Sequence, residues 1–127
     1  MNDKKPIVLD VGQCSFDHGN ISRMLSENFS ADVKHAATSE EAFRAIRACH
    51  FSLVLVNRIF DADGAPGLDF IQRLQSHEET RAIPVVLVSN YAEVQRAAVA
   101  AGAKRGFGKD ALTSPETHDL LASLLGR

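Results

Sequence analysis

Short runs of apolar residues recur along the chain and predict strands. The clearest runs are Ile7–Val11, Leu53–Val56 and Val85–Val88, with weaker ones near Val33 and Phe107. Within the clear runs the apolar residues follow one another almost without a break instead of alternating with polar ones. Such runs are expected where helices cover both faces of a parallel sheet. The pattern therefore predicts strands that are buried on both sides.

The segments between these runs carry apolar residues at helical spacing. The shared faces are Ile21, Met24 and Leu25; Ala42, Phe43, Ile46 and Cys49; Leu68, Ile71 and Leu74; Val94, Ala97, Ala98 and Ala101; and Leu120, Leu121, Leu124 and Leu125. Thr38 and Glu41 predict a capping box before the second helix, and Ser114 followed by Pro115 predicts the start of the fifth. Gly102 predicts the end of the fourth helix in a left-handed conformation.

Strands that alternate with helices in this way predict an α/β fold in which the unit βα occurs five times. Right-handed crossovers then give a doubly wound, flavodoxin-like parallel sheet with strand order 2-1-3-4-5. In such sheets, chemistry gathers outside the carboxyl ends of the strands, near the point where the winding reverses. We therefore expect four segments to meet there: Val11–Cys14, Asn57–Arg58, Ser89–Asn90 and Gly108–Lys109.

The composition narrows the function classes. The 127 residues are 45% apolar and 24% charged, which is typical of a globular chain, and we expect one domain over residues 1–127. The formal net charge of −2 gives no sign of the basic surface that binds nucleic acid, so we expect no nucleic-acid partner. The apolar runs are far shorter than the roughly 20 residues of a membrane helix, and MNDKKP lacks the apolar segment of a secretory signal. We expect no membrane association, a cytoplasmic location, and reduced thiols at Cys14 and Cys49.

Several stretches match one family in order and spacing. Ile83–Ser89 is similar to a strand that ends in a hydroxyl residue, Ala100–Ala103 to a G-A turn that precedes a lysine, here Lys109, and Gly64–Leu74 to a helix that starts after D-G-L. Over essentially its whole length the chain resembles the receiver domain of response regulators in two-component signalling. The resemblance implies protein partners in a signalling pathway. It also implies a site made of a phosphoacceptor aspartate after strand 3, two metal-binding acids after strand 1, a Ser/Thr after strand 4 and a lysine after strand 5.

The acidic positions of that family's site are neutral in this sequence. Asn57 stands at the position of the phosphoacceptor, and Gly12 and Gln13 stand at the positions of the two acids. An amide is a far poorer nucleophile than a carboxylate, and Mg²⁺ prefers carboxylate oxygens. We therefore predict a degenerate receiver that is not phosphorylated at the usual position. It should have no catalytic residue, no metal, no cofactor and no enzymatic activity.

Three further positions correspond to the receiver switch. Ser89 and Lys109 match the residues that bind the phosphoryl group, and Gly106 stands where an aromatic switch residue is usual. We expect Lys109 to donate to the amide oxygen of Asn57 and Ser89 to join the same network, with helix capping as the alternative for Ser89. Asp110 replaces the proline that normally follows the lysine, so the last loop should be shaped differently.

Two acidic stretches leave alternatives open. Asp61 and Asp63 suit turns and caps, but a receiver phosphorylated on one of them is an alternative. The stretch Ile59–Gly64 also resembles the first motif of haloacid-dehalogenase-type phosphatases. The position after this motif is Ala65 in this chain, whereas that family usually has a threonine there. Asp10 is expected to have a structural role, with a metal ligand as the alternative.

The partner surface implied by the resemblance is the face formed by the fourth helix, fifth strand and fifth helix. Receivers commonly use this face for docking and dimerisation. Its expected residues are Tyr91, Val99, Lys104, Arg105 and Phe107. We therefore predict a module that acts through a protein partner, with a homodimer through the same face as a second option.

Overall fold

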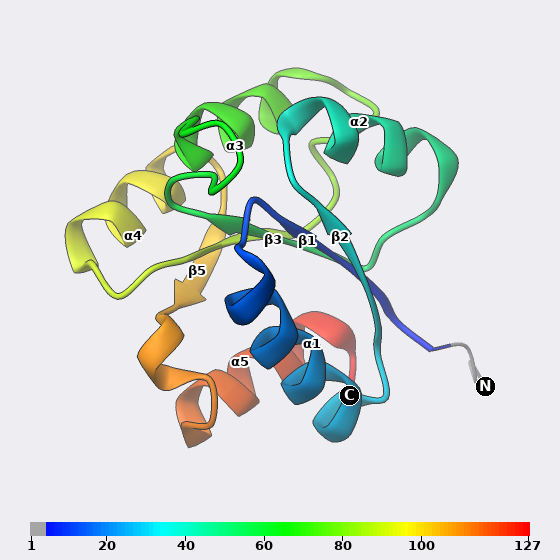
Figure 1. Cartoon of the computed structure of the whole chain (residues 1–127), viewed down its shortest axis with the longest axis vertical. Coiled ribbons are helices and arrows are strands. Elements are labelled where there is room, and N and C mark those ends of the chain that lie inside the picture. Colours follow the sequence, from blue (N-terminus) through cyan, green and yellow to red (C-terminus); the bar gives the residue numbers. More distant parts are fainter. Residues whose placement is uncertain (1–4) are drawn as a thin grey trace.

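The computed structural model describes residues 5–127, in which a parallel sheet lies between two layers of helices (Figure 1). The strands are β1 (Ile7–Val11), β2 (Asp32–Ala36), β3 (Leu53–Asn57), β4 (Val85–Val88) and β5 (Lys104–Phe107). The helices are α1 (Ser15–Phe29), α2 (Ser39–Ala48), α3 (Gly67–Ser76), α4 (Ala92–Ala100) and α5 (Pro115–Leu125), with a short 3₁₀ helix, η1 (Lys109–Ala111), before α5. The strand order β2-β1-β3-β4-β5 confirms the predicted topology.

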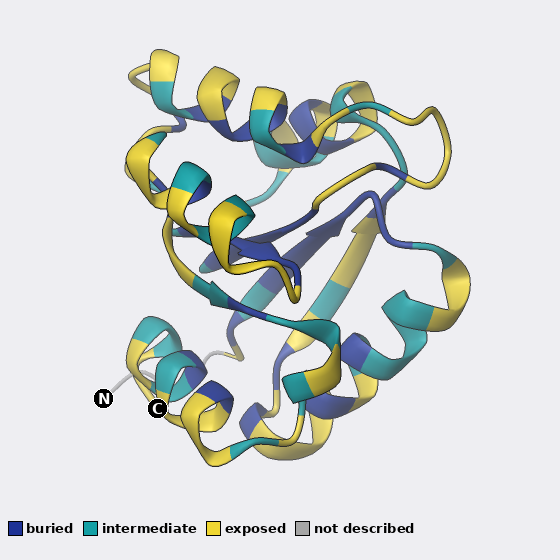
Figure 2. Cartoon of the chain, turned by 90° about the vertical axis from the view of Figure 1, so that its left-hand side faces the viewer, coloured by how far each residue is buried: buried dark blue, intermediate teal, exposed yellow. Residues whose placement is uncertain are grey.

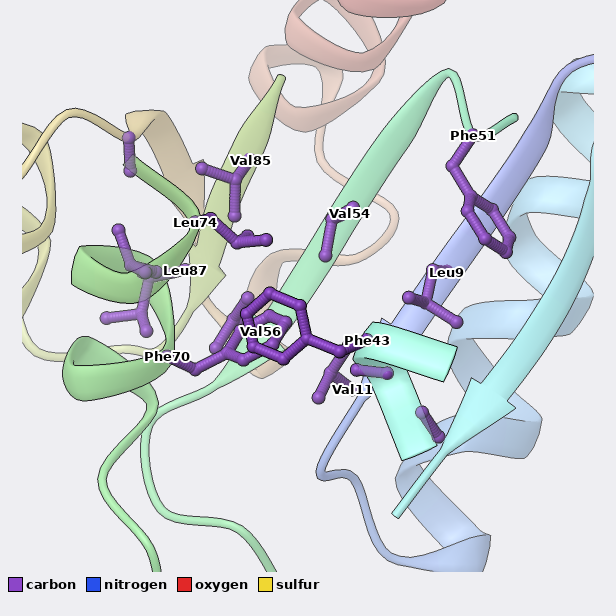
Figure 3. Packing of buried hydrophobic residues seen from close by; sticks show 14 of the residues in the cluster. Leu9, Val11, Phe43, Phe51, Val54, Val56, Phe70, Leu74, Val85 and Leu87 are labelled. Atoms are coloured by element: carbon purple, nitrogen blue, oxygen red, sulfur yellow. The ribbon is translucent and has the colours of Figure 1, made fainter. Parts of the chain in front are cut away.

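Alternate residues of the central strands face opposite helix layers, with α2, α3 and α4 on one side and α1 and α5 on the other (Figure 1). Val54 and Val56 of β3 pack in one cluster with Phe70 of α3 (Figure 3). Leu53 and Leu55 of the same strand belong to a second cluster with residues of α1 and α5. Figure 2 shows the buried residues concentrated in the central strands. Burial on both faces explains why these strands read as unbroken apolar runs.

The predicted helix boundaries have their expected causes. Thr38 Oγ1 accepts from the backbone N–H of Glu41 at 3.2 Å, and a Glu41 carboxylate oxygen accepts from Ala37 N at 3.3 Å, one residue before the expected partner. Ser114 Oγ accepts from a backbone N–H in the first turn of α5. Gly102 follows α4 with a φ of +111°, a conformation that favours glycine. No helix within residues 5–127 is long and apolar enough to cross a lipid bilayer.

Candidate functional site

The carboxyl ends of β1, β3, β4 and β5 bring the four predicted segments to one edge of the sheet. Two backbone hydrogen bonds tie the loops there: Asp61 N donates to Gly12 O at 2.9 Å, and Ser89 N donates to Phe107 O at 2.9 Å. Because the strands are parallel, every strand end at this edge is followed by a loop that can contribute a side chain. The functional question is therefore which side chains these loops supply.

Gly12 can only be a glycine in this backbone. Its φ is +82°, and a Cβ built on it would overlap the ring of the buried Phe60. An acidic side chain at this position would need both a strained backbone and displacement of that ring. The fold around position 12 is therefore incompatible with an acidic residue there.

Asn57 uses its amide as a double donor. The residue is buried, and its Nδ2 donates to Gly12 O at 3.0 Å and to Ile59 O at 2.7 Å. Since both partners are carbonyl oxygens, only the NH₂ side of the amide can face them. Asn57 thus fastens the β1–α1 loop to the β3–α3 loop, a role that a carboxylate could not fill.

Asp10 and Gln13 place buried polar atoms behind these loops. Asp10 has no exposed surface, and its Oδ2 lies 2.8 Å from Nδ1 of His18. Asp10 Oδ1 and both polar atoms of the Gln13 side chain are buried and make no hydrogen bond of good geometry with any atom of residues 5–127, although Gln13 lies close enough to Asp10 to help lower its pKa. Burial raises the pKa of the Asp10 carboxyl, and the hydrogen bond to His18 offsets part of that effect.

Lys109 is held by a carboxylate and not by Asn57, which corrects the prediction from the sequence. Its Nζ donates to Asp17 Oδ2 at 2.8 Å, and both side chains are partly buried. Asp17 lies in the first turn of α1, where an acid also complements the helix dipole. The cation that would bind a phosphoryl group in a receiver is thus already paired within the chain.

Ser89 acts in the turn before α4 and not in a network with Asn57. The residue is buried, and its Oγ accepts from Tyr91 N at 3.2 Å. This is the local side chain to backbone bond typical of serine at the start of a helix. The capping alternative is therefore the one that the contacts support.

Gln95 of α4 ties the backbone together around Gly106. Gln95 of α4 donates through Nε2 to Leu87 O at 2.8 Å and to Ser89 O at 3.1 Å, and its Oε1 accepts from Gly106 N at 3.1 Å. The register between β4 and β5 shifts at this point, so Gln95 satisfies backbone groups there. A Cβ at Gly106 would overlap Leu87 O and crowd Gln95 Oε1. A side chain at position 106 is incompatible with this tie.

The loop after β5 is closed by a reciprocal pair at Asp110, the position where receivers have a proline. Asn90 Nδ2 donates to Asp110 Oδ2 at 3.1 Å, and Asp110 N donates to Asn90 Oδ1 at 3.2 Å. The backbone N–H used here is one that proline lacks. The substitution noted in the sequence thus links the β4–α4 loop to η1.

The acids of the β3–α3 loop lie at the surface. Asp61 and Asp63 are exposed, and Asp63 Oδ1 accepts from Ala65 N at 3.0 Å, as expected of a turn residue. The Mg²⁺ site implied by the resemblance does not fit the donors present, because positions 12, 13 and 57 carry no carboxylate and Asp10 and Asp17 already bind His18 and Lys109. Within residues 5–127, no group of three or more His, Cys, Asp or Glu is placed to hold a metal ion.

The expected partner surface is exposed except at one residue. Tyr91, Val99, Lys104 and Arg105 are exposed, whereas Phe107 is buried in the core against α1 and α5. Phe107 nevertheless lines the groove between α4 and β5 beside Arg105 and Gly106, so its contribution to this surface stays a prediction. The register shift in β5 turns Phe107 inward, and the sequence gives no sign of that shift.

Residues that sequence reasoning missed do much of the positioning. Asp17 pairs with Lys109, Gln95 ties α4 to the sheet, and His18 and His35 flank Asp10. The cation Lys109 after β5 was a signal that an acid should lie nearby. Which acid that is depends on how α1 is rotated about its axis, and the sequence does not show this. The role of Gln95 could not be predicted, because the sequence does not distinguish a glutamine that binds the sheet from one that points to solvent.

The fold of the chain is similar to that of several proteins of known structure. No protein-family model and no curated protein matches the chain. Among solved structures, the chain is similar to the signal receiver domain of a DNA-binding response regulator from Colwellia psychrerythraea, with a TM-score of 0.82, 19% identity and coverage of 97% of this chain and 100% of that one. It is also similar to a response regulator from Thermotoga maritima, with a TM-score of 0.77, 22% identity and coverage of 98% and 100%. A chemotaxis response regulator of Vibrio cholerae gives a TM-score of 0.71 at 18% identity, with 98% of each chain covered.

The chain therefore has the receiver fold. At these identities the likeness shows the fold alone, and the fold hosts more than one function. The function has to be argued from the residues at the carboxyl edge of the sheet.

Proposed function

We propose that the chain is a receiver-like signalling module of the two-component type that acts by binding another protein and is not phosphorylated at the usual position. The observation that carries this proposal is the amide of Asn57, whose Nδ2 is committed to Gly12 O and Ile59 O. Because Nδ2 of this amide faces the loops as a hydrogen-bond donor, position 57 offers no carboxylate oxygen as a nucleophile, which is the group on which receivers form the acyl phosphate.

The charges around Asn57 support the same conclusion. Transfer of a phosphoryl group depends on cations that neutralise charge as it develops. Lys109 already binds Asp17, and the residues at positions 12 and 13 offer no carboxylate to a metal ion. Neither of the two positive groups that receivers use is thus free at this edge.

The first prediction concerns phosphorylation. After incubation with acetyl phosphate and Mg²⁺, the intact mass of the chain should be unchanged, while a conventional receiver domain treated in parallel gains one phosphoryl group. The same samples should not hydrolyse p-nitrophenyl phosphate. A phosphoryl gain that Asp61→Asn or Asp63→Asn abolishes would establish the phosphorylated alternative. Turnover lost in Asp61→Asn would establish the phosphatase.

The proposed docking surface is built around a groove between α4, β5 and η1. The groove has a volume of about 690 Å³ and includes the backbone of Gly106 and Gly108. Arg96 and Arg105 line it, no Asp or Glu does, and neither arginine is in an ion pair within residues 5–127. Exposed Val99 adds an apolar contact. The groove suits an acidic partner that carries an apolar side chain.

The charges of this face favour a different protein over a second copy. A two-fold dimer would place the same patch against itself, so Arg96, Lys104 and Arg105 would lie against the same basic patch of the second copy. Like charges brought together in an interface oppose association. An acidic partner would instead be attracted, with an affinity that falls as salt rises.

The second prediction tests this docking face. Analytical ultracentrifugation should find a monomer at low and at high salt. In affinity capture from the source cell, the same proteins should be retained by the native chain and by Arg44→Glu on exposed α2, and lost from the double variant Arg96→Glu/Arg105→Glu. Equal retention by all three chains would argue against this surface, and a dimer broken by Val99→Asp would favour the second copy.

A further inference from the structure

Three ionisable side chains meet where α1 packs on the sheet, and none of them takes part in the proposed function. Asp10 on β1 and His35 on β2 are paired across the parallel ladder. His18 comes from the first turns of α1, and its ring lies over that of His35 with centroids 4.4 Å apart and planes tilted by 31°. The cluster thus joins one helix to two strands.

The hydrogen bonds of the cluster define where its protons sit. His35 Nε2 lies 3.0 Å from Gln13 O, and since a carbonyl only accepts, Nε2 carries the proton and Nδ1 is left to accept one. His18 Nδ1 lies 2.8 Å from Asp10 Oδ2, which leaves His18 Nε2 as its second site. Each neutral ring therefore has one nitrogen that can take up a proton. His35 is exposed, so protons reach it without any opening of the fold.

The cluster holds one negative charge for two potential positive ones. The groups that act electrostatically on Asp10 are His18 and His35, and Gln13 from the β1–α1 loop is neutral. On α1, Asp17 lies next to His18, but its carboxylate binds Lys109 of η1. A first added proton is balanced by Asp10. A second would put two imidazolium rings in contact, and no further carboxylate among residues 5–127 is paired with either ring.

We propose that Asp10, His18 and His35 form a proton-sensitive latch, which holds the first turns of α1 against β1 and β2 when the imidazoles are neutral and releases them when both are protonated. Imidazoles in water ordinarily titrate between roughly pH 5 and 8. Once α1 moves away, the two rings no longer contact each other, so both can be charged in solvent with less repulsion than in the closed cluster. The open state binds more protons than the closed state, so a fall in pH favours opening.

The latch reaches the loop after β5 through one short connection. His18 follows Asp17 directly, and Asp17 Oδ2 accepts from Lys109 Nζ at 2.8 Å. Movement of this turn of α1 would free Lys109 from its carboxylate. Protonation of the latch would therefore change how α1 and η1 are arranged at the edge of the sheet where the loops meet.

The test is NMR on the ¹⁵N-labelled chain between roughly pH 8 and pH 5. The ring nitrogen signals of His18 and His35 report the protonation of the cluster at each pH. After correction for intrinsic exchange, amide protection at residues 18–21 should fall by up to about tenfold per pH unit, as expected for one additional proton in the open state. Protection in α5 should stay constant over the same range.

Two variants and one control separate a latch from a passive pair. His35→Gln keeps a donor for Gln13 O but removes the second charge, and His18→Asn keeps a donor for Asp10, so both should lose the pH dependence at residues 18–21. His50→Gln, at an exposed position between α2 and β3, should behave like the native chain. The proposal is overturned if protection in the native chain does not change with pH, or if His35→Gln opens to the same extent. If His18→Asn does not fold, the native chain and His35→Gln still decide the outcome.

Discussion

At the scale of the residue, Asn57 is a structural donor at the end of β3. We predict that Asn57→Asp destabilises the fold, because a carboxylate would face the carbonyl oxygens of Gly12 and Ile59 in a buried site. An unsatisfied buried polar group costs about 1–3 kcal/mol, and a charged one costs more. Urea unfolding at neutral pH measures the change. The deficit should shrink as the pH falls, since a protonated carboxyl regains one donor.

The control for this change is Asn28→Asp, the same substitution at an exposed position of α1, which should leave the unfolding free energy nearly unchanged. Asn57→Asp should also remain unmodified by acetyl phosphate, because Lys109 is still paired with Asp17 and no metal-binding acids have been restored. If the variant were as stable as the native chain and became phosphorylated, position 57 would be a nucleophile site that lacks only its carboxylate.

At the scale of the element, Gln95 fixes α4 to the sheet. We predict that Gln95→Leu destabilises the chain by about 1–3 kcal/mol, because Leu87 O and Gly106 N lose their side-chain partner. Amide exchange at Gly106 should accelerate more than exchange in α1, which lies on the other side of the sheet. Gln72→Leu, an exposed substitution on α3, is the matched control. Equal exchange at Gly106 in both variants would show that α4 is held by apolar packing alone.

At the scale of the molecule, the sequence predicted the arrangement of elements because burial on both sheet faces leaves a direct mark in the chain. The short apolar run Leu53–Val56, bounded by polar residues, suits a central strand, and the order of the strands followed from the alternation with helices. The positions of Gly12 and Asn57 at the carboxyl edge followed from that order. Two features of the site could not be predicted, because they leave no pattern in the sequence. One is the rotation of α1 that directs Asp17 toward Lys109, and the other is the register shift in β5 that places Phe107 against α1 and α5.

The pair formed by Asp17 and Lys109 joins α1 to the end of β5, across 92 positions of sequence. As a partly exposed ion pair it should contribute no more than about 1 kcal/mol to stability, yet it occupies the ammonium group of Lys109, which an anion at this edge would need. We predict that Asp17→Asn frees Lys109, so that inorganic phosphate raises the melting temperature of this variant and not that of the native chain. Phosphate titration followed by thermal unfolding measures the effect, and the double variant Asp17→Asn/Lys109→Ala should lose it. A native chain stabilised by phosphate as strongly as Asp17→Asn would mean that Asp17 does not block Lys109, and that the edge of the sheet still binds anions.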